Sequence, residues 1–256
     1  MLFSHNGVKS ESNRETKLRI IGIITKWLFI VCLPLLLLTA SLALAVNSAW
    51  LYEYGFEKYQ VGQTTGLDWP ELEKASTGLV HYFNSGEENV SLSVVKDGEP
   101  FVLFNQREVV HLRDVKGLIW LDYWILLGTL IYALAYAGVS LWRKNRRQLF
   151  WGLVWGSGLT LALMLALGLG ALFNFERLFL QFHLISFANE LWLLDPTRDY
   201  LIMLFPQGFW FDATLFCTGV AWAGALILGG VGVGFVYSPT SSSITSSSIS
   251  SARRGL

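Results

Sequence analysis

The chain has 256 residues, of which 53% are apolar and only 15% are charged, with 19 basic and 19 acidic side chains. Soluble chains carry charge at roughly 25% of positions, so this composition indicates an integral membrane protein. No basic domain and no interleaved basic and aromatic motif occurs, so we expect no nucleic-acid partner. Cys32 and Cys217 each lie in an apolar run, which predicts two buried, unpaired thiols.

Four apolar segments are long enough to cross a bilayer, since about 20 helical residues span its ~30 Å hydrocarbon core. The first, residues 27–46, exceeds the apolar length of a secretory signal and is expected to stay as an uncleaved anchor. The second, together with the residues that lead into it from the outer side, covers residues 118–142. The third and fourth cover residues 151–173 and 211–237. Tryptophan and tyrosine at the ends of these segments are typical of an aromatic belt.

Small residues recur four positions apart in the third and fourth segments, as in Gly152-x-x-x-Gly156 and Gly230-x-x-x-Gly234. Such spacing lets helix backbones approach closely in a membrane. It predicts that the four helices form a compact bundle, and it indicates no particular chemistry.

Most of the basic residues lie in three of the remaining segments, residues 1–26, 143–150 and 238–256. These segments hold eleven of the nineteen basic residues and only two acidic ones. The positive-inside rule therefore places both termini and the 143–150 loop in the cytoplasm, with residues 47–117 and 174–210 outside. The tail from residue 238 is rich in serine and lacks apolar periodicity, so we expect it to be disordered and dispensable.

Residues 47–117 are long enough for a small cap. The run Asp68-Trp-Pro-Glu71 resembles a capping box, and the helical spacing after it predicts a helix over residues 69–83. Asp97-Gly98 between two β-rich runs predicts a hairpin. The predicted fold class is a mainly α polytopic membrane protein, with four transmembrane helices and a small mixed α/β extracytoplasmic cap.

Two histidines are expected at the outer membrane surface, where segments 47–117 and 174–210 meet the bundle. His111 lies in a helical run with Glu108 and Asp114 three residues to either side and Arg107 one turn earlier. Either carboxylate could accept a hydrogen bond from one imidazole nitrogen, which would leave the other nitrogen free as a base.

His183 lies in a second run, for which the spacing predicts a helix from about residue 175 to residue 192. On that helix Phe179, Phe182, Phe187 and Glu190 share one stripe with His183. An aromatic face with polar groups set into it suits a site at the membrane interface. Three further polar or aromatic candidates accompany this stripe: Asn189, Trp192 and Asp195.

Several interpretations of these residues compete. Each histidine could be an ordinary polar residue at headgroup level, as we expect for His81, and His5 lies in the cytoplasmic segment. A metal site of His111, His183, Asp114 and Glu190 lacks any H-x-x-x-H or H-E-x-x-H spacing. A serine nucleophile lacks the G-x-S-x-G elbow. Two histidines that act as base and acid need neither motif.

Two motifs in these runs are specific in combination: F-x-x-R-E-x-x-H-x-x-D-V before the second span, and F-H followed by N-x-x-W-x-x-D-P-x-x-D-x-L-I before the fourth. With the four-span layout, they resemble the bacterial lipoprotein intramolecular transacylase family from the first span through the fourth. Arg198 and Gln207 depart from that pattern.

The resemblance implies an enzyme of the plasma membrane, with His111 and His183 as its catalytic pair and no metal or other cofactor. Its substrate would be a diacylglyceryl-modified lipoprotein that passes its sn-2 acyl chain to its own α-amino group. Membrane lipids are the other expected partners, and we expect a monomer. The alternative is a non-catalytic membrane scaffold that binds lipid or lipoprotein.

A shared site requires the two imidazoles to lie roughly 4–8 Å apart, so that both reach one substrate. Phe179, Phe182, Phe187, Trp192 and Trp120 are expected to line it, and either Asn189 or a backbone amide could steady an oxyanion. The carboxylates beside His111 favour it as the base, whereas the phenylalanines around His183 favour that residue as the acid.

Overall fold

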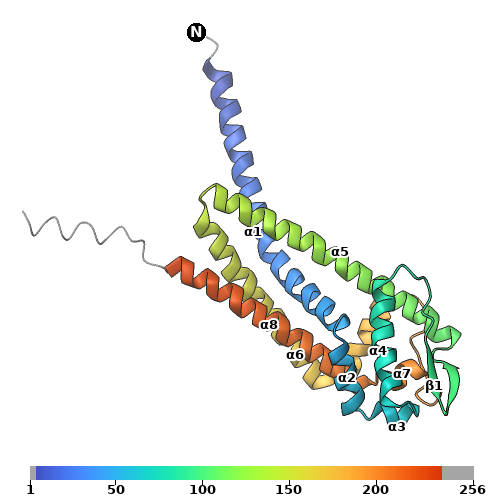
Figure 1. Cartoon of the computed structure of the whole chain (residues 1–256). Coiled ribbons are helices and arrows are strands. Elements are labelled where there is room, and N and C mark those ends of the chain that lie inside the picture. The colour runs from blue at the N-terminus through green and yellow to red at the C-terminus, as the bar shows by residue number, and fades with distance from the viewer. Residues whose placement is uncertain (1–3, 238–256) are drawn as a thin grey trace, which may run out of the picture.

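The structure is a computed structural model that describes residues 4–237, with side chains from residue 14 onward. Four helices are long and apolar enough to span a membrane. They are α1 (Ser4–Val46), α5 (Gln106–Trp142), α6 (Arg146–Ser186) and α8 (Gln207–Tyr237). In Figure 1 they run alongside one another, and the remaining short elements gather at one end as a cap. The predicted fold class is confirmed, whereas the serine-rich tail lies outside the described residues.

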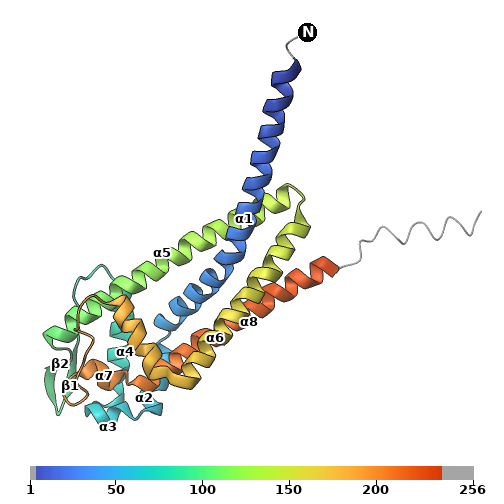
Figure 2. The same cartoon turned by 180° about the vertical axis from the view of Figure 1, so that it is seen from behind.

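The start of α1, the α5–α6 connection and the end of α8 all lie at the end of the bundle away from the cap (Figures 1 and 2). Helix α1 packs against α5, α6 and α8, and α6 and α8 pack closely along their length. Cys32 and Cys217 are buried and unpaired, as predicted.

Glycines set the closest helix approaches. A Cβ atom at Gly152 would lie 2.9 Å from the Phe29 ring, and one at Gly156 would lie 3.0 Å from the Leu33 side chain. The small-residue prediction is therefore confirmed for α6. It is wrong for Gly230, which faces open space. The glycines of α8 that meet α6 here are Gly229 and Gly232, where an added Cβ atom would lie 3.0 Å from Ser157 Cβ and 2.9 Å from the Phe150 carbonyl oxygen.

The cap consists of four short helices and one hairpin: α2 (Ala49–Lys58), α3 (Val61–Thr65), α4 (Trp69–Asn84), β1 (Ser93–Lys96), β2 (Glu99–Val102) and α7 (Tyr200–Leu204). Strands β1 and β2 are antiparallel, and Asp97 and Gly98 have φ values of 54° and 82°. Positive φ at both central residues is the pattern of a type I′ turn, which confirms the predicted hairpin.

The capping box predicted at Asp68 is wrong, although the helix that follows it is present. The Asp68 side chain makes no capping hydrogen bond. Glu71 instead accepts a hydrogen bond from the Val95 backbone amide at 2.9 Å. A long-range bond to β1 therefore replaces the local one and joins α4 to the hairpin.

The cap core is continuous with the nearest ends of the long helices. Phe56, Leu79 and Leu204 are almost fully buried in a cluster that also contains Leu112 of α5 and Phe209 of α8. A polar contact reinforces this packing, because the Lys58 ammonium lies 2.7 Å from a carboxylate oxygen of Asp212 on α8. The hydrogen bond to Asp212 raises the pKa of Lys58 above its ordinary value. The cap is thus attached to α5 and α8.

Candidate active site

The turn that carries His111 is held at the start of α5 by a capping box. The Asn105 side-chain oxygen accepts from the backbone amides of Arg107 and Glu108, and the Glu108 carboxylate accepts from the Asn105 amide at 2.8 Å. The second Glu108 oxygen accepts from the Leu201 amide at 2.6 Å, and Glu108 is 1% exposed. Glu108 therefore joins α5 to α7, and it makes no hydrogen bond to His111.

His111 is buried in this turn, with 6% of its surface exposed. Its Nδ1 atom has no hydrogen-bond partner among the described residues. The Asp114 carboxylate accepts a hydrogen bond from the Asn189 side-chain amide at 2.9 Å. The predicted hydrogen bond between His111 and a neighbouring carboxylate is wrong, since neither Glu108 nor Asp114 is hydrogen-bonded to His111 among the described residues.

His183 lies near the end of α6, which bends at Asn174 and ends at Ser186. The predicted helix to residue 192 is wrong, so Glu190 does not share a helical stripe with His183. The chain becomes extended at Phe187, and the Asn189 side chain then accepts from the Leu191 amide at 3.0 Å. Such local side-chain bonds compete with a continuing helix.

The His183 ring is oriented by its own helix. Its Nδ1 atom lies 2.8 Å from the Phe179 backbone carbonyl oxygen. A carbonyl oxygen can only accept, so Nδ1 carries the hydrogen, and Nε2 of the neutral ring is the acceptor. His183 is 8% exposed, which places this nitrogen in a largely enclosed setting.

The two imidazoles face each other with ring centroids 6.4 Å apart and an interplanar angle of 28°. This spacing confirms the geometric prediction. Phe187 contacts both rings, and its ring centroid lies 5.0 Å from that of His111 and 5.6 Å from that of His183. Three further aromatic rings contact His183, at 4.3, 5.3 and 4.9 Å respectively: Phe179, Phe182 and Trp192.

Trp120 is placed differently from these aromatic residues. Its indole nitrogen donates to the Phe83 carbonyl oxygen at 3.1 Å, which attaches α5 to the end of α4. No ring contact joins Trp120 to either histidine within residues 14–237. The structure thus gathers Phe179, Phe182, Phe187 and Trp192 around the histidine pair and leaves Trp120 at the cap.

Arg107 is the second connection between the two histidine-bearing regions. Its guanidinium donates to the backbone carbonyl oxygens of Glu190, at 2.7 Å, and Leu191, at 3.4 Å. The Glu190 side chain is exposed, so only its backbone takes part. Arg107 and the Asp114–Asn189 pair together hold the segment after α6 against α5.

Asp195 shapes the turn before α7. Its carboxylate accepts from the backbone amide and the hydroxyl of Thr197, at 2.9 and 2.7 Å, and the Arg198 guanidinium lies 3.5 Å away. These hydrogen bonds to Thr197 lower the pKa of Asp195. Asp195 is therefore bound within its own loop.

Two supporting residues were missed by sequence reasoning. Asp199 is 2% exposed and accepts from the Asn105 side-chain amide at 2.9 Å and from the Asp195 backbone amide at 2.7 Å. Asn105 could have been found, because Asn105-x-x-Glu108 has the spacing of a capping box. Asp199 carries no such local pattern, since its partner Asn105 lies 94 residues away in the chain.

The residues considered for a metal do not converge. Within residues 4–237, no group of three or more His, Cys, Asp or Glu side chains is arranged to hold a metal ion. Asp114 is bound to Asn189, and Glu190 points its side chain to the surface.

A sequence model of the family described as "Lipoprotein intramolecular transacylase Lit" matches residues 27–210. The chain belongs to the Lit family. It is thereby an enzyme of the acyltransferase class, as the two motifs indicated. An uncharacterised protein from Aquifex aeolicus (strain VF5) is 28% identical over 192 residues, which cover 74% of this chain and 84% of that protein.

Solved structures show the same fold. The Lit transacylase of Bacillus cereus superimposes with a TM-score of 0.68 at 22% identity, over 83% of this chain and 93% of that one. A Bacillus cereus variant with one histidine replaced by alanine gives a TM-score of 0.71 at 18% identity, over 87% and 97% of the two chains. A Bacillus cereus variant with a histidine replaced by arginine gives a TM-score of 0.66 at 21% identity, over 87% of this chain and 96% of that chain.

Proposed function

We propose that His111 and His183 are the catalytic pair for intramolecular acyl transfer in a diacylglyceryl-modified bacterial lipoprotein. The α-amine of the modified cysteine attacks the sn-2 ester carbonyl, so an N–C bond forms and the ester C–O bond breaks. The proton lost by the amine is matched by one gained at the sn-2 oxygen, which leaves as a hydroxyl. The facing imidazoles, 6.4 Å apart in an aromatic setting, carry this proposal.

The reaction depends more on how the amine and the ester are positioned than on a strong acid or base. The attacking nitrogen reaches the ester through Cα, Cβ, sulfur and two glyceryl carbons, so attack closes an eight-membered ring. Such rings close poorly in free lipid, and holding the reacting atoms near 3–3.5 Å contributes several kcal/mol to a barrier reduction. The aromatic residues around His183 supply an apolar setting that restrains the glyceryl group and its acyl chain.

The geometry favours His183 as the base, which reverses the assignment based on neighbouring carboxylates. The bond from Nδ1 to the Phe179 carbonyl presents Nε2 as an acceptor. The free α-amine has a pKa of about 7.7–8.0, so an imidazole is a sufficient base. Burial lowers the pKa of His111 to about 4, so its neutral ring donates an N–H hydrogen bond to the departing oxygen, which receives the proton that His183 took from the amine. Both histidines come from one chain, which is consistent with a monomer.

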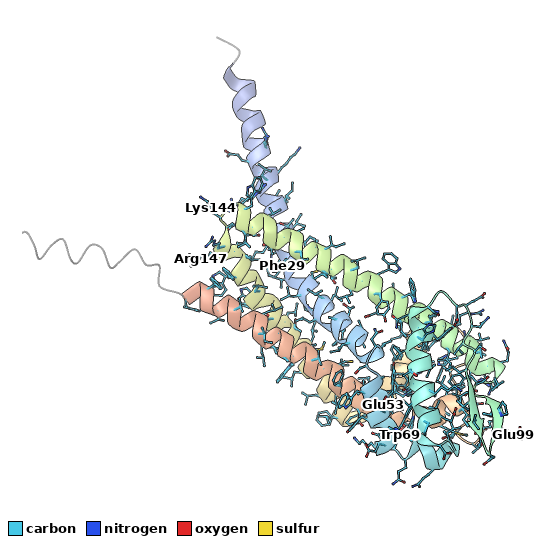
Figure 3. All side chains as sticks on the ribbon, in the orientation of Figure 1. Phe29, Glu53, Trp69, Glu99, Lys144 and Arg147 are labelled. Atoms are coloured by element: carbon cyan, nitrogen blue, oxygen red, sulfur yellow. The ribbon has the colours of Figure 1, made fainter. Side chains whose placement is uncertain are left out.

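The charge distribution supports an orientation. Lys144 and Arg147 lie at the end of the bundle opposite Glu53, Trp69 and Glu99 of the cap (Figure 3). The positive-inside rule then puts both termini in the cytoplasm and the histidines at the outer face of the plasma membrane. That face is where lipoproteins carry their lipid. Cysteine labelling that found position 146 outside would overturn this arrangement.

The test is mass spectrometry of a diacylglyceryl lipoprotein from cells that express wild type, His111→Asn or His183→Asn. Loss of either acid–base group should slow transfer by about 10²–10⁴-fold, so that the sn-2 chain stays on the glyceryl group. His81→Asn is the matched control, because His81 is exposed on the far face of α4 and should leave transfer unchanged.

Full acyl migration in either catalytic variant would remove that histidine from the mechanism. A non-catalytic scaffold predicts no transfer even for wild type purified into lipid. The division of roles is tested by the pH–rate profile of residual activity. Loss of the base should remove the acidic limb, and we expect this for the His183 variant.

A further inference from the structure

A basic recess lies at the end of the bundle opposite the histidines, where α1 meets the start of α6. One cavity of about 490 Å³ is lined by Lys26, Asn145, Arg147, Gln148, Trp151 and Trp155. A second, of about 440 Å³, is lined by Arg19, Gly22, Ile23, Lys26, Trp27 and Gln148. Lys26 and Gln148 line both cavities, so the two form one surface, which we call the basic recess.

The helix packing explains why the recess forms here. Gly152 of α6 meets the ring of Phe29 on α1, and Phe29 is 2% exposed. Lys26 and Gln148 lie about one turn before these residues on their two helices, where long polar side chains replace the close contact. Figure 3 shows Arg147 at this end of the bundle, near the labelled Phe29.

The charges in the recess have one sign. Arg19, Lys26 and Arg147 line it, and none of the three forms an ion pair within residues 14–237. No acidic side chain of the described residues lines either cavity. Three unpaired cations beside the amides of Asn145 and Gln148 suit a phosphate group with hydrogen-bonding oxygens.

The border of the recess is apolar and faces outward. Trp27 is 60% exposed and Trp155 is 59% exposed, so neither indole is packed inside the bundle. Indoles at the end of a membrane helix lie at headgroup level, with acyl chains on one side and water on the other. Basic pockets between transmembrane helices on the cytoplasmic side suit anionic lipid headgroups. The acyl chains of a lipid can pack against the indoles, whereas a free anion makes no such contact. The indoles therefore favour a lipid over a free anion as the ligand.

We propose that the basic recess binds the phosphate headgroup of an anionic phospholipid, with its acyl chains against Trp27 and Trp155. The lipid belongs to the leaflet opposite the one that holds the acyl-transfer substrate, so this site is separate from the histidine pair. Its phosphate bridges α1 and α6 at the end of the bundle that the cap does not hold together.

The test uses the full chain in phosphatidylcholine nanodiscs that contain graded amounts of phosphatidylglycerol. The thermal midpoint should rise with phosphatidylglycerol, and native mass spectrometry should detect a retained anionic lipid. In Lys26→Gln/Arg147→Gln, the apparent affinity should fall roughly tenfold or more, because each basic side chain contributes to anionic-lipid binding. Arg143→Gln/Lys144→Gln is the matched control, since it removes one arginine and one lysine at the same end, outside the recess.

Equal losses in the two double variants would overturn the site and indicate a diffuse attraction. Equal stabilisation by inorganic phosphate in neutral nanodiscs would show that a free anion, not a lipid, is bound. Should the recess variant not fold, photocrosslinking of wild type by a phosphatidylglycerol probe decides the matter. Crosslinks within residues 19–27 and 145–155 support the proposal, and crosslinks spread over all lipid-facing helices contradict it.

Discussion

The two histidines of the site lie at different helix ends, His111 near the start of a helix and His183 near the end of another. Different interactions hold these two ends in place. His111 lies close to the start of α5, where a capping box from Asn105 and Glu108 satisfies the first backbone amides. His183 lies close to the end of α6, and the chain after it is held by side chains of α5, chiefly Arg107 and Asp114. The capping box is local in sequence, with one further bond from Glu108 to Leu201, whereas the bonds of Arg107 and Asp114 cross about eighty residues of chain.

This difference indicates which perturbations act on folding and which act on the site alone. The support of His111 is buried and shared with α7, so damage to it should lower stability and activity together. The support of His183 is partly exposed and acts on an irregular segment, so damage to it should lower activity with little loss of stability. The following variants test that division, from the largest expected effect to the smallest.

Glu108→Gln should have the largest effect on folding. The amide keeps one oxygen acceptor but places an NH₂ group against a backbone amide of Asn105 or Leu201. Loss of a buried, charge-assisted hydrogen bond should lower the free energy of unfolding by about 2–3 kcal/mol. Thermal unfolding in detergent measures this. Glu88→Gln is the control, since Glu88 is exposed in its ion pair with Arg113 and should cost about 0–1 kcal/mol.

Arg107→Gln should mainly reduce catalysis. Without the guanidinium, the carbonyl oxygens of Glu190 and Leu191 lose their donor, and the segment with Phe187 and Trp192 shifts relative to His111. Displacement by about 1 Å costs on the order of 100-fold in rate, so a fall of roughly 10- to 100-fold is expected. Arg107→Lys should be intermediate. A change in the thermal midpoint as large as that of Glu108→Gln would contradict the division.

Asn189→Ala and Asp114→Ala should each reduce the transfer rate several-fold, and the two effects should not add. Their side chains bind each other at 2.9 Å, so a double-mutant cycle should give a coupling of about 1 kcal/mol. Arg113→Gln, on the same helix but bound to Glu88, is the matched control and should be silent. Fully additive losses would show that the pair does not act as one support.

Asp195→Asn should have the smallest effect, visible only in its pH dependence. The Thr197 amide and hydroxyl lower the pKa of Asp195 in the folded state, so its stabilising contribution is present above the unfolded pKa of about 3.9. That contribution is lost as the pH falls through the lower folded value. The difference in thermal midpoint between wild type and variant should therefore be small at neutral pH and vanish in acid. A difference that grew in acid would reverse this sign.

Local patterns were reliable for the four spans and for the hairpin. Apolar runs of about twenty residues have no other stable setting than a membrane helix, and Asp97-Gly98 favours a hairpin turn through its own backbone preferences. The helix after Asp68 follows from its spacing even though the predicted cap is absent. The same reasoning failed at residues 187–192, where helical spacing continues but Asn189 and Arg107 bind the backbone that a helix would need.

The sequence alone determined four spans, a small cap, the segregation of charge and a pair of histidines at one membrane depth. These follow from burial and backbone preferences that act within one segment. Only the tertiary structure decided that Glu108 binds two backbone amides and that Trp120 donates a hydrogen bond to Phe83 of the cap. It also decided that the Phe179 carbonyl sets the His183 tautomer. Each of these depends on which donor or acceptor comes within about 3 Å, and the fold, rather than residue type, determines that distance.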